Sequence, residues 1–560
     1  MFHSKQTSLF EMGSNKQTSV TSSPFLHAGM KKSAETTSGN GSLKYSTIGN
    51  SFVDQFGKIS SYKQPRQYQD VANDMDTLWA INPYMTICLT FFIRMITRVT
   101  SLFNGNKTAS VQRGGGLKHE GIFRMIWIEI NHPEVFWNNI HLFISIGSWK
   151  DIITMLQYDL MYNGWKNRIL DWNNMGKLIL TALENPNTSE LIKKYLPQIK
   201  ANNQCKTIEA QADNMIAKWI CSLLYGGKQE DYSKYKLYRK MKSSGTAHQW
   251  QQLISQGKHK LVNFNTIPGR ALSLLVSGKY LANNHLEAEY EKWIANKPVA
   301  KFTGYVYELA SKINYGNKKY QIDTINAQYN QLLQTAGKTN SNFIVVKDAS
   351  GSMDDTAIGT NMSSYHIAKS LSIFLGNMIQ GWFHNHYIDF SSKAILRKIE
   401  GSNFVEHWNS EKRVQFANTN FIAVCDLLIS ILQQGVKETD FPTGIICISD
   451  GQFDKENWNY GTITQQFKQK MLDFGFSKSF VDNFKFVFWD IRNNFYGERF
   501  ANTKFESYGP EKNVFYFGGF DPSVITFLTG VEGKEQKAPT NAEELFQTAM
   551  NQEIMQMIQI

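Results

Sequence analysis

Apolar residues recur at helical spacing through much of the chain's N-terminal half. One such set lies at positions i, i+4, i+7 and i+8 and consists of Phe136, Ile140, Phe143 and Ile144. Gly147 follows it, and the sequence from Ser148 to Asp151 has the pattern of a capping box that begins a new helix. We therefore predict antiparallel helix pairs over residues 71–335, in a degenerate HEAT-like repeat array.

The pattern changes after the polar segment 336–342, which we interpret as a linker. Short apolar runs typical of buried strands then alternate with helical segments. This order predicts a doubly wound, Rossmann-like α/β domain over residues 343–560, with a mainly parallel sheet and one antiparallel edge. The expected strands are 343–347, 384–390, 394–399, 444–449, 484–490 and 514–517, and the expected helices are 365–379, 422–433, 462–474 and 542–556.

The first 70 residues have a different composition. Ser and Thr supply 18 of the first 60 residues, and few apolar residues cluster. Such a segment buries too little surface to offset the entropy lost on ordering. We predict a mostly disordered, slightly basic tail over residues 1–70.

Composition narrows the class of protein. A chain of 560 residues with 42% hydrophobic residues is long enough for two or three domains. The net charge of +11 favours an anionic partner, with nucleic acid ahead of membrane. Five scattered cysteines without C-x-x-C spacing indicate neither disulfides nor zinc and fit a reducing, cytoplasmic setting. The most apolar window, 79–103, contains Pro and Arg, so we expect a buried helix pair there and no membrane span.

Oxygen-bearing side chains follow two of the predicted strands. The sequence from Asp348 to Ser352 is D-A-S-G-S, which places a carboxylate and two hydroxyls on a glycine-containing turn. Thr419 lies in a polar loop before a helix, and Asp450 ends another apolar strand. Because ligands bind at the carboxyl ends of strands in open α/β sheets, the turn after the strand 343–347 is a candidate cation site. All-oxygen ligands suit Mg²⁺, or Mn²⁺.

The order strand–DxSxS, loop–Thr and strand–Asp resembles the metal-ion-dependent adhesion site of von Willebrand factor A domains. The resemblance implies that Ser350, Ser352 and Thr419 bind the metal directly, while Asp348 and Asp450 hold it through bound water. It also implies that the sixth position stays open for an oxygen from a partner.

The same residue types also occur in helix caps, in phosphatases and in nucleases. Asp and Ser after a strand often cap the next helix or form turns. An aspartyl-phosphate phosphatase with Asp348 as nucleophile needs a second carboxylate two residues later, where Ser350 stands. A metal-dependent nuclease usually holds its ions with several direct carboxylates. We therefore expect a non-catalytic protein.

The helical half carries a second set of motifs. An R-G-G-x-G-x-K-like turn within 112–124 precedes a helix and the G-x-W-x-D sequence 147–151, and the turn 264–272 contains Pro-x-x-Ala. Together they resemble the TROVE-type helical module of Ro ribonucleoproteins, and still more their poorly characterised viral, bacterial and plant relatives. The order of the domains matches that family from about residue 75 to 560. The resemblance implies binding of small structured or misfolded RNA.

RNA binding needs cations for phosphates and flat rings for stacking. The segment 232–242 interleaves Tyr with Lys and Arg. The candidate RNA-binding residues are Arg113, Lys118, Arg124, Lys150, Tyr235, Arg239, Lys242, Arg270 and Lys279.

Structural roles compete with the RNA-binding ones. The 232–242 segment also fits an ordinary half-solvated helix face, and the Gly114–Gly116 turn fits either a phosphate cradle or a backbone that needs positive φ. Glu120 and Arg124 have the spacing of an i,i+4 ion pair, and Trp149 fits a core position.

Two functions remain open from the sequence. The first is a non-catalytic RNA-binding scaffold of a ribonucleoprotein, with a Mg²⁺-binding von Willebrand A-type domain. The second is a protein–protein adaptor, in which an acidic residue of a protein partner completes the metal's coordination and RNA has no role.

Overall fold

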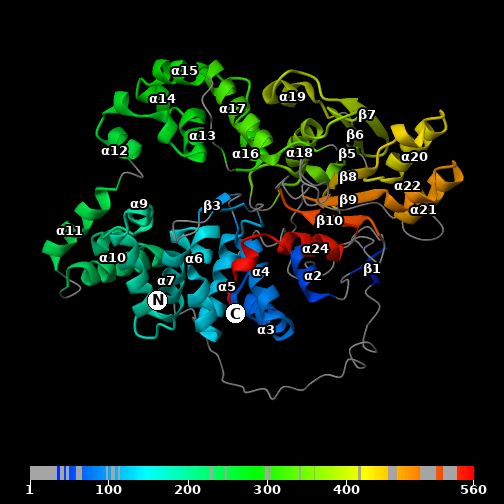
Figure 1. Ribbon diagram of the computed structural model, residues 1–560. Helices are drawn as coiled ribbons and strands as arrows, with labels where there is room; N and C mark the ends of the chain where they lie inside the picture. The colour runs from blue at the N-terminus through cyan, green and yellow to red at the C-terminus, as the bar shows by residue number, and fades with distance from the viewer. Residues whose placement is uncertain are drawn as a thin grey trace, which may run out of the picture. The chain divides into compact units, whose positions relative to one another are not determined.

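The structure is a computed structural model that describes residues 35–37, 43–45, 50–58, 66–95, 99–101, 108–110, 114–226, 231–245, 249–296, 302, 304–339, 342–357, 360–413, 418–451, 463–491, 512–520, 539–540 and 542–560. Contacts divide these residues into two compact units, each described by itself. The first unit lies within Pro65–Gln256 and Met550–Ile560, and the second within Met30–Gln64 and Gly257–Ala549. Figure 1 shows a helical first unit and a second unit that combines helices with a sheet.

The first unit is built from helices of seven to eighteen residues. They are α3 (Tyr68–Ile81), α4 (Pro83–Arg94), α5 (Lys118–Asn131), α6 (Pro133–Ile146), α7 (Trp149–Asn163), α8 (Trp172–Glu184), α9 (Pro186–Tyr195), α10 (Ile208–Tyr225), α11 (Tyr232–Ser243) and α12 (Gln249–Ser255). Two short strands, β3 (Val99–Ser101) and β4 (Thr108–Ser110), pair antiparallel. The predicted apolar stripe of α6 is buried, which confirms the helical interpretation of this half.

A buried ion pair joins α4 to α7. The Arg94 guanidinium donates from Nε and Nη2 to the two oxygens of Asp151, both at 2.8 Å. The same carboxylate accepts from the Ser148 backbone N–H, which confirms the predicted capping box. A Cβ on Gly147 would lie 2.1 Å from Asp151 Oδ2, so only glycine fits beside the pair. The motif 147–151 is therefore explained by packing within the helical unit, and Trp149 is buried as expected.

The second unit contains a six-stranded sheet in the order β10-β9-β8-β5-β6-β7. Its strands are β5 (Phe343–Asp348), β6 (His386–Phe390), β7 (Ala394–Lys398), β8 (Gly444–Ser449), β9 (Lys485–Asp490) and β10 (Val514–Gly518). All neighbours are parallel except β6 and β7. This arrangement confirms the predicted sheet with one antiparallel edge.

Helices cover both faces of this sheet. Alternate residues such as Val346 and Cys447 pack on one face against α20 (Ile422–Leu432), α21 (Ile463–Asp473) and α22 (Lys478–Asn483). Residues between them face α18 (Ser364–Met378), as the contact from Lys347 to Tyr365 shows. Strands β5 and β8 are buried along their whole length, as central parallel strands must be.

The second unit also includes helices that precede the sheet. They are α13 (Gly269–Ser277), α14 (Tyr280–Asn283), α15 (Glu287–Ala295), α16 (Val306–Ala310) and α17 (Lys319–Ala336). In α17 the Tyr329 ring stacks on Phe404 of α19 (Phe404–Ser410) with centroids 4.1 Å apart, and its hydroxyl donates to Asn377. Contacts divide the described residues at 256/257, so the expected linker 336–342 lies within the second unit.

Most of the expected tail, residues 1–70, lies outside the described residues, and the described part of it contains regular structure. Within the expected disordered tail, α2 (Ser51–Lys58) is a helix whose Phe52 and Phe56 contact Phe546 of α24 (Ala542–Met550), and β1 (Glu35–Thr37) pairs with β2 (Leu43–Tyr45). The C-terminal helix ends at residue 550, short of the expected 556. The following segment joins the first unit, where Asn139 exchanges hydrogen bonds of 2.5 and 2.9 Å with the Gln559 backbone.

Across the ranges given above, no helix has both the length and the apolar character needed to cross a membrane. Within the apolar window 79–103, residues Pro83–Arg94 form α4, and the side chain of Asn82 caps the N-terminus of this helix.

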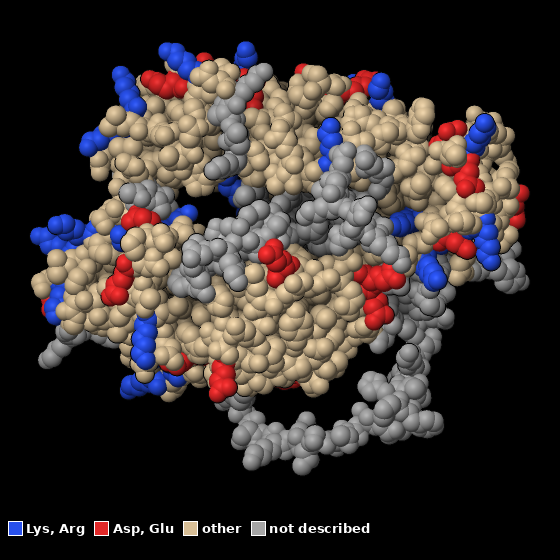
Figure 2. All heavy atoms as spheres, viewed as in Figure 1, with Lys and Arg blue, Asp and Glu red and all other residues tan. Residues whose placement is uncertain are grey.

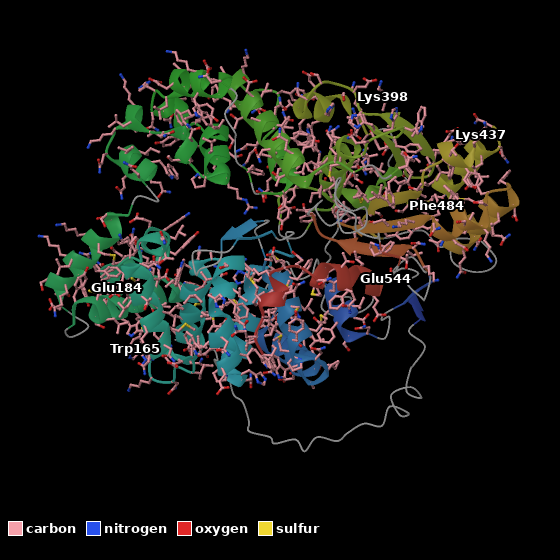
Figure 3. The ribbon with its side chains drawn as sticks, in the orientation of Figure 1. Trp165, Glu184, Lys398, Lys437, Phe484 and Glu544 are labelled. Atoms are coloured by element: carbon pink, nitrogen blue, oxygen red, sulfur yellow. The ribbon has the colours of Figure 1, made fainter. Side chains whose placement is uncertain are left out.

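We predict that Asp151→Asn destabilises the first unit by about 3–5 kcal/mol, because it leaves the buried Arg94 guanidinium without a counter-charge. Chemical denaturation followed by circular dichroism measures this change. Glu184→Gln on the exposed surface of α8 is the matched control (Figure 3). Equal midpoints for the two variants would contradict the assigned role of the pair.

Candidate metal centre and basic surface

The predicted metal site lies at the carboxyl ends of β5 and β8. Asp348 is fully buried, and its Oδ1 accepts from the Ser350 backbone N–H at 2.8 Å. Its Oδ2 accepts from the Ser449 hydroxyl at 2.6 Å, which links the ends of the two neighbouring strands. The carboxylate is thus held in place by the turn that follows it and by the adjacent strand.

Two of the expected metal ligands lie side by side on that turn. Ser350 Oγ and Ser352 Oγ are 3.2 Å apart. Two adjacent ligands of an octahedral Mg²⁺ ion with bonds of about 2.1 Å lie about 3 Å apart. The spacing of the two hydroxyls therefore fits two neighbouring positions of such an ion.

The loop that carries Thr419 is tied to the same edge of the sheet. Ser391 lies just after β6, and its hydroxyl donates to the Asn418 carbonyl at 2.9 Å. The backbone carbonyl of Ser391 accepts from the Asn420 N–H at 3.1 Å. The Ala349 N–H in turn donates to the Phe390 carbonyl at 2.8 Å. Thr419 is buried between these anchors. Hydrogen bonds thus connect the Thr419 loop, through the end of β6, to the turn after Asp348.

The electrostatics of the site suit a divalent cation. Burial and the negative charge of Asp450 raise the pKa of Asp348 to about 7. Two buried carboxylates that repel each other are stabilised by a cation between them. With the serine hydroxyls they form an all-oxygen donor set, which fits Mg²⁺. No group of three His, Cys, Asp or Glu suited to a metal occurs among the described residues.

A buried charge network behind the site was missed in the sequence. Lys347 is fully buried on the opposite face of β5, where its ammonium contacts Glu411, the Tyr365 hydroxyl at 3.1 Å and Asp389 at 3.5 Å. Lys369 of α18 binds the same glutamate at 2.9 Å. The signal that reveals it is a lysine inside the apolar run of a central strand.

This network positions Arg413 two residues beyond Glu411. The guanidinium donates to the Ala349 carbonyl at 2.9 Å, to the Ser350 carbonyl and to Asp354. It also lies 4.4 Å from the centre of the Tyr365 ring. Arg413 therefore clamps the backbone of the turn that presents the two serine hydroxyls.

Three of the candidate RNA-binding residues come together in the first unit. Asp213 of α10 interacts electrostatically with Lys118, Lys150 and Lys242, and also with Lys200, which sequence reasoning missed. We call these four lysines the lysine cluster. Glu209 also interacts with Asp213, so the four lysines and two carboxylates have a net formal charge of +2. Figure 2 shows further basic side chains gathered where α11 lies in Figure 1.

Burial lowers the pKa of Lys118, and the positive charge of Lys150 adds to this effect. Burial likewise lowers the pKa of Lys242, partly opposed by Asp213 and reinforced by Lys200. Lys150 and Lys200 are exposed. The cluster is therefore an electropositive surface that a polyanion would stabilise.

Other candidates have structural roles. Arg124 is fully buried and pairs with Glu120 at 2.9 Å, so the i,i+4 interpretation was right and RNA contact was wrong for this residue. Tyr235 is also buried, which leaves little ring surface for stacking. Arg239 is exposed, and its guanidinium donates to the Ile199 carbonyl at 3.2 Å.

The remaining candidates lie elsewhere. Arg270 pairs with Glu308, and Lys279 is exposed, but both belong to the second unit. Arg113 lies outside the described residues. The glycine turn does not serve as a phosphate cradle: the Gly115 N–H donates to the Phe92 carbonyl at 2.8 Å, and a Cβ on Gly114 would meet that same oxygen at 1.9 Å.

Comparisons with known proteins give limited guidance. A family model described as a domain of unknown function (DUF7788) matches residues 342–559, a range that begins one residue before β5. The crystal structure of the Deinococcus radiodurans RO (RSR) protein is similar with 11% identity and a TM-score of 0.39, covering 77% of this chain and 87% of that one. So low a TM-score supports no inference about function. A search of curated protein sequences gives no match.

We predict a pH-dependent stability that originates in Glu411. Burial acts to raise the pKa of this carboxyl, but the charges of Lys347 and Lys369 outweigh it and lower the pKa to about 2. A depressed pKa stabilises the fold above the unfolded value of about 4.5 and loses that contribution as pH falls toward 2, about 3 kcal/mol in all.

The measurement is urea denaturation of wild type and Glu411→Gln between about pH 6 and pH 2.5. Glu411→Gln should be less stable near pH 6, and the difference should shrink as the wild-type carboxylate becomes protonated. A difference that does not change with pH would contradict the charge network.

Proposed function

We propose that this protein is a non-catalytic RNA-binding scaffold whose sheet unit holds Mg²⁺ or Mn²⁺. The single observation that carries the RNA part is the lysine cluster around Asp213. Its cations come from the N-terminal turns of α5 and α7, the loop before α10 and the end of α11, so segments distant in sequence build one electropositive surface. Phosphate groups bind such surfaces with release of counterions.

The sequence resemblance of this half to TROVE-type modules supports the same ligand, since those modules belong to ribonucleoproteins. The overall charge of +11 adds long-range attraction for a polyanion. Within the described residues the cluster contains no catalytic carboxylate pair or nucleophile next to a base, and we assign it a binding role only.

The metal part of the proposal rests on the donor set at the end of β5. Ser350, Ser352 and Thr419 would supply hydroxyl oxygens, and Asp348 and Asp450 would hold bound water and balance the ion's charge. Such a metal supplies an electrophilic position for an acidic ligand. The hydroxyl-rich set favours capture of a carboxylate or phosphate oxygen over activation of water.

We predict that single-stranded RNA binds with an affinity that falls steeply as salt rises. In Lys118→Ala/Lys150→Ala the affinity should fall roughly tenfold and the salt dependence should become shallower, by about 0.7 in log–log slope for each lost phosphate contact. Fluorescence anisotropy of a labelled RNA oligonucleotide at several salt concentrations measures both quantities.

The matched control is Lys166→Ala/Lys177→Ala, which removes two exposed lysines of the same unit outside the lysine cluster. It should bind as the wild type does. Equal losses in the two double variants, or binding that does not respond to salt, would contradict the assignment of the cluster.

We predict that Mg²⁺ raises the melting temperature of the wild type. Magnesium at about ten times its Kd adds roughly 1.4 kcal/mol to the stability of a protein that binds it only when folded. Asp348→Asn should fold but lose this increase, while Asp440→Asn, an exposed carboxylate of the same unit, should retain it. An equal rise in all three proteins would contradict the metal site.

The adaptor function is the alternative that these experiments separate. If a protein partner supplies the acidic ligand, its capture depends on metal and survives nuclease. If RNA is the partner, capture is lost on nuclease treatment. A pull-down with and without chelator and nuclease therefore decides between the two.

A further inference from the structure

A pocket of about 530 Å³ opens in the first unit between α9, α11 and the start of α12. Its cations are Lys193, Lys194, Arg239 and Lys242, and its one carboxylate is Glu190. The formal charge of the lining is therefore +3. The volume lies within the range of small-molecule sites, about 300–1,000 Å³, and is too large for a single phosphate ion.

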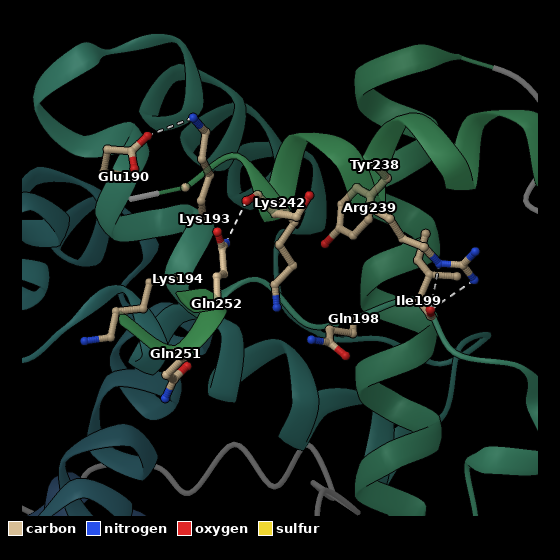
Figure 4. A pocket seen from close by; sticks show the side chains of 12 residues that line it. Glu190, Lys193, Lys194, Gln198, Ile199, Tyr238, Arg239, Lys242, Gln251 and Gln252 are labelled. Atoms are coloured by element: carbon tan, nitrogen blue, oxygen red, sulfur yellow. Dashed lines mark hydrogen bonds and ion pairs between the residues drawn. The ribbon is translucent and has the colours of Figure 1, made fainter. Parts of the chain in front are cut away.

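The cations in this pocket differ in whether they already have a hydrogen-bond or ion-pair partner. Lys193 turns toward Glu190 and pairs with it at 3.0 Å, and Arg239 donates to the Ile199 carbonyl. The Lys242 ammonium has no hydrogen-bond or ion-pair partner within the described part of the chain and extends toward the side chain of Gln198 (Figure 4). Among the described residues the Lys194 ammonium has no such partner either and lies 5.2 Å from the centre of the Tyr195 ring, so two ammonium groups are available to an anion in this cavity.

Three glutamine amides also line the pocket. Gln198 and Gln251 line the pocket and are exposed, and Gln252 is fixed by donation to the Ser243 carbonyl at 2.8 Å. A primary amide offers both a donor and an acceptor, as the edges of nucleobases require. The buried Tyr238, held by its hydroxyl to the Pro197 carbonyl at 2.9 Å, supplies an apolar wall.

We propose that this pocket binds one phosphorylated nucleoside unit, with the phosphate at Lys242 and the base among the glutamine amides. The unit is either a free nucleoside monophosphate or one nucleotide of a bound RNA strand. The second source rests on the proposed function, and the first does not. Because Lys242 also belongs to the lysine cluster, a strand lying along that surface would pass the mouth of the pocket.

Calorimetric titration with adenosine monophosphate, adenosine and inorganic phosphate tests the ligand chemistry. We expect binding of the monophosphate, at least tenfold weaker binding of adenosine and of phosphate, and a loss of roughly tenfold in Lys242→Met. Lys166→Met is the matched control and should bind as the wild type does. Equal affinity for phosphate and the monophosphate, or no effect of Lys242→Met, would overturn the proposal.

Competition separates the two sources. If adenosine monophosphate displaces a labelled RNA oligonucleotide, the pocket takes a nucleotide of the strand; if both bind together, it takes the free nucleotide. Lys118→Ala/Lys150→Ala should lose RNA affinity and retain the monophosphate. If the wild type binds the monophosphate but no RNA, the proposed function is wrong and the nucleotide pocket is supported. If it binds RNA but no monophosphate, the nucleotide pocket is wrong and the proposed function is supported.

Discussion

The burial of the Asp348 carboxylate beside Asp450 is the constraint on which the sheet unit's candidate site depends. Burial, and after it the repulsion from the neighbouring Asp450, raises the pKa of Asp348 to about 7. Hydrogen bonds from Ser350 and Ser449 offset part of that cost. A divalent cation would offset more of it, and the neighbouring serine hydroxyls are spaced to bind one.

The two faces of β5 are used differently. At its end, Asp348 and the following turn form the candidate metal site, whereas the preceding residue, Lys347, points to the other face and organises a buried charge network. Glu411 is held in that network, and Arg413 then reaches the carbonyls of the turn. The segment 411–413 therefore connects the buried charge network to the turn that forms the candidate metal site. Removing either Lys347 or Glu411 would leave the other charge buried without a partner, and the free energy lost would exceed what the ion pair contributes to stability.

Much of the second unit could be predicted from the sequence, because continuous apolar runs indicate central strands buried on both faces and period-3.6 patterns indicate helices. Strand β8 and helix α20 begin where they were expected. The burial of candidate cations such as Arg124 could not be predicted from the sequence. An arginine in a buried i,i+4 ion pair and an arginine on a solvent-exposed helix face can have the same local sequence. The stacking of Tyr329 on Phe404, which joins α17 to α19, also depends on residues far apart in the chain, and it was not predicted.

The central claim is that a metal binds the oxygens at the carboxyl edge of β5 and β8. The most direct measurement is anomalous diffraction from crystals soaked in Mn²⁺. Our account predicts one strong peak about 2.2 Å from both Ser350 Oγ and Ser352 Oγ, with Asp348 and Asp450 in contact through water. A peak at another position would contradict it. So would the absence of a peak at this edge at a Mn²⁺ concentration that saturates binding in solution.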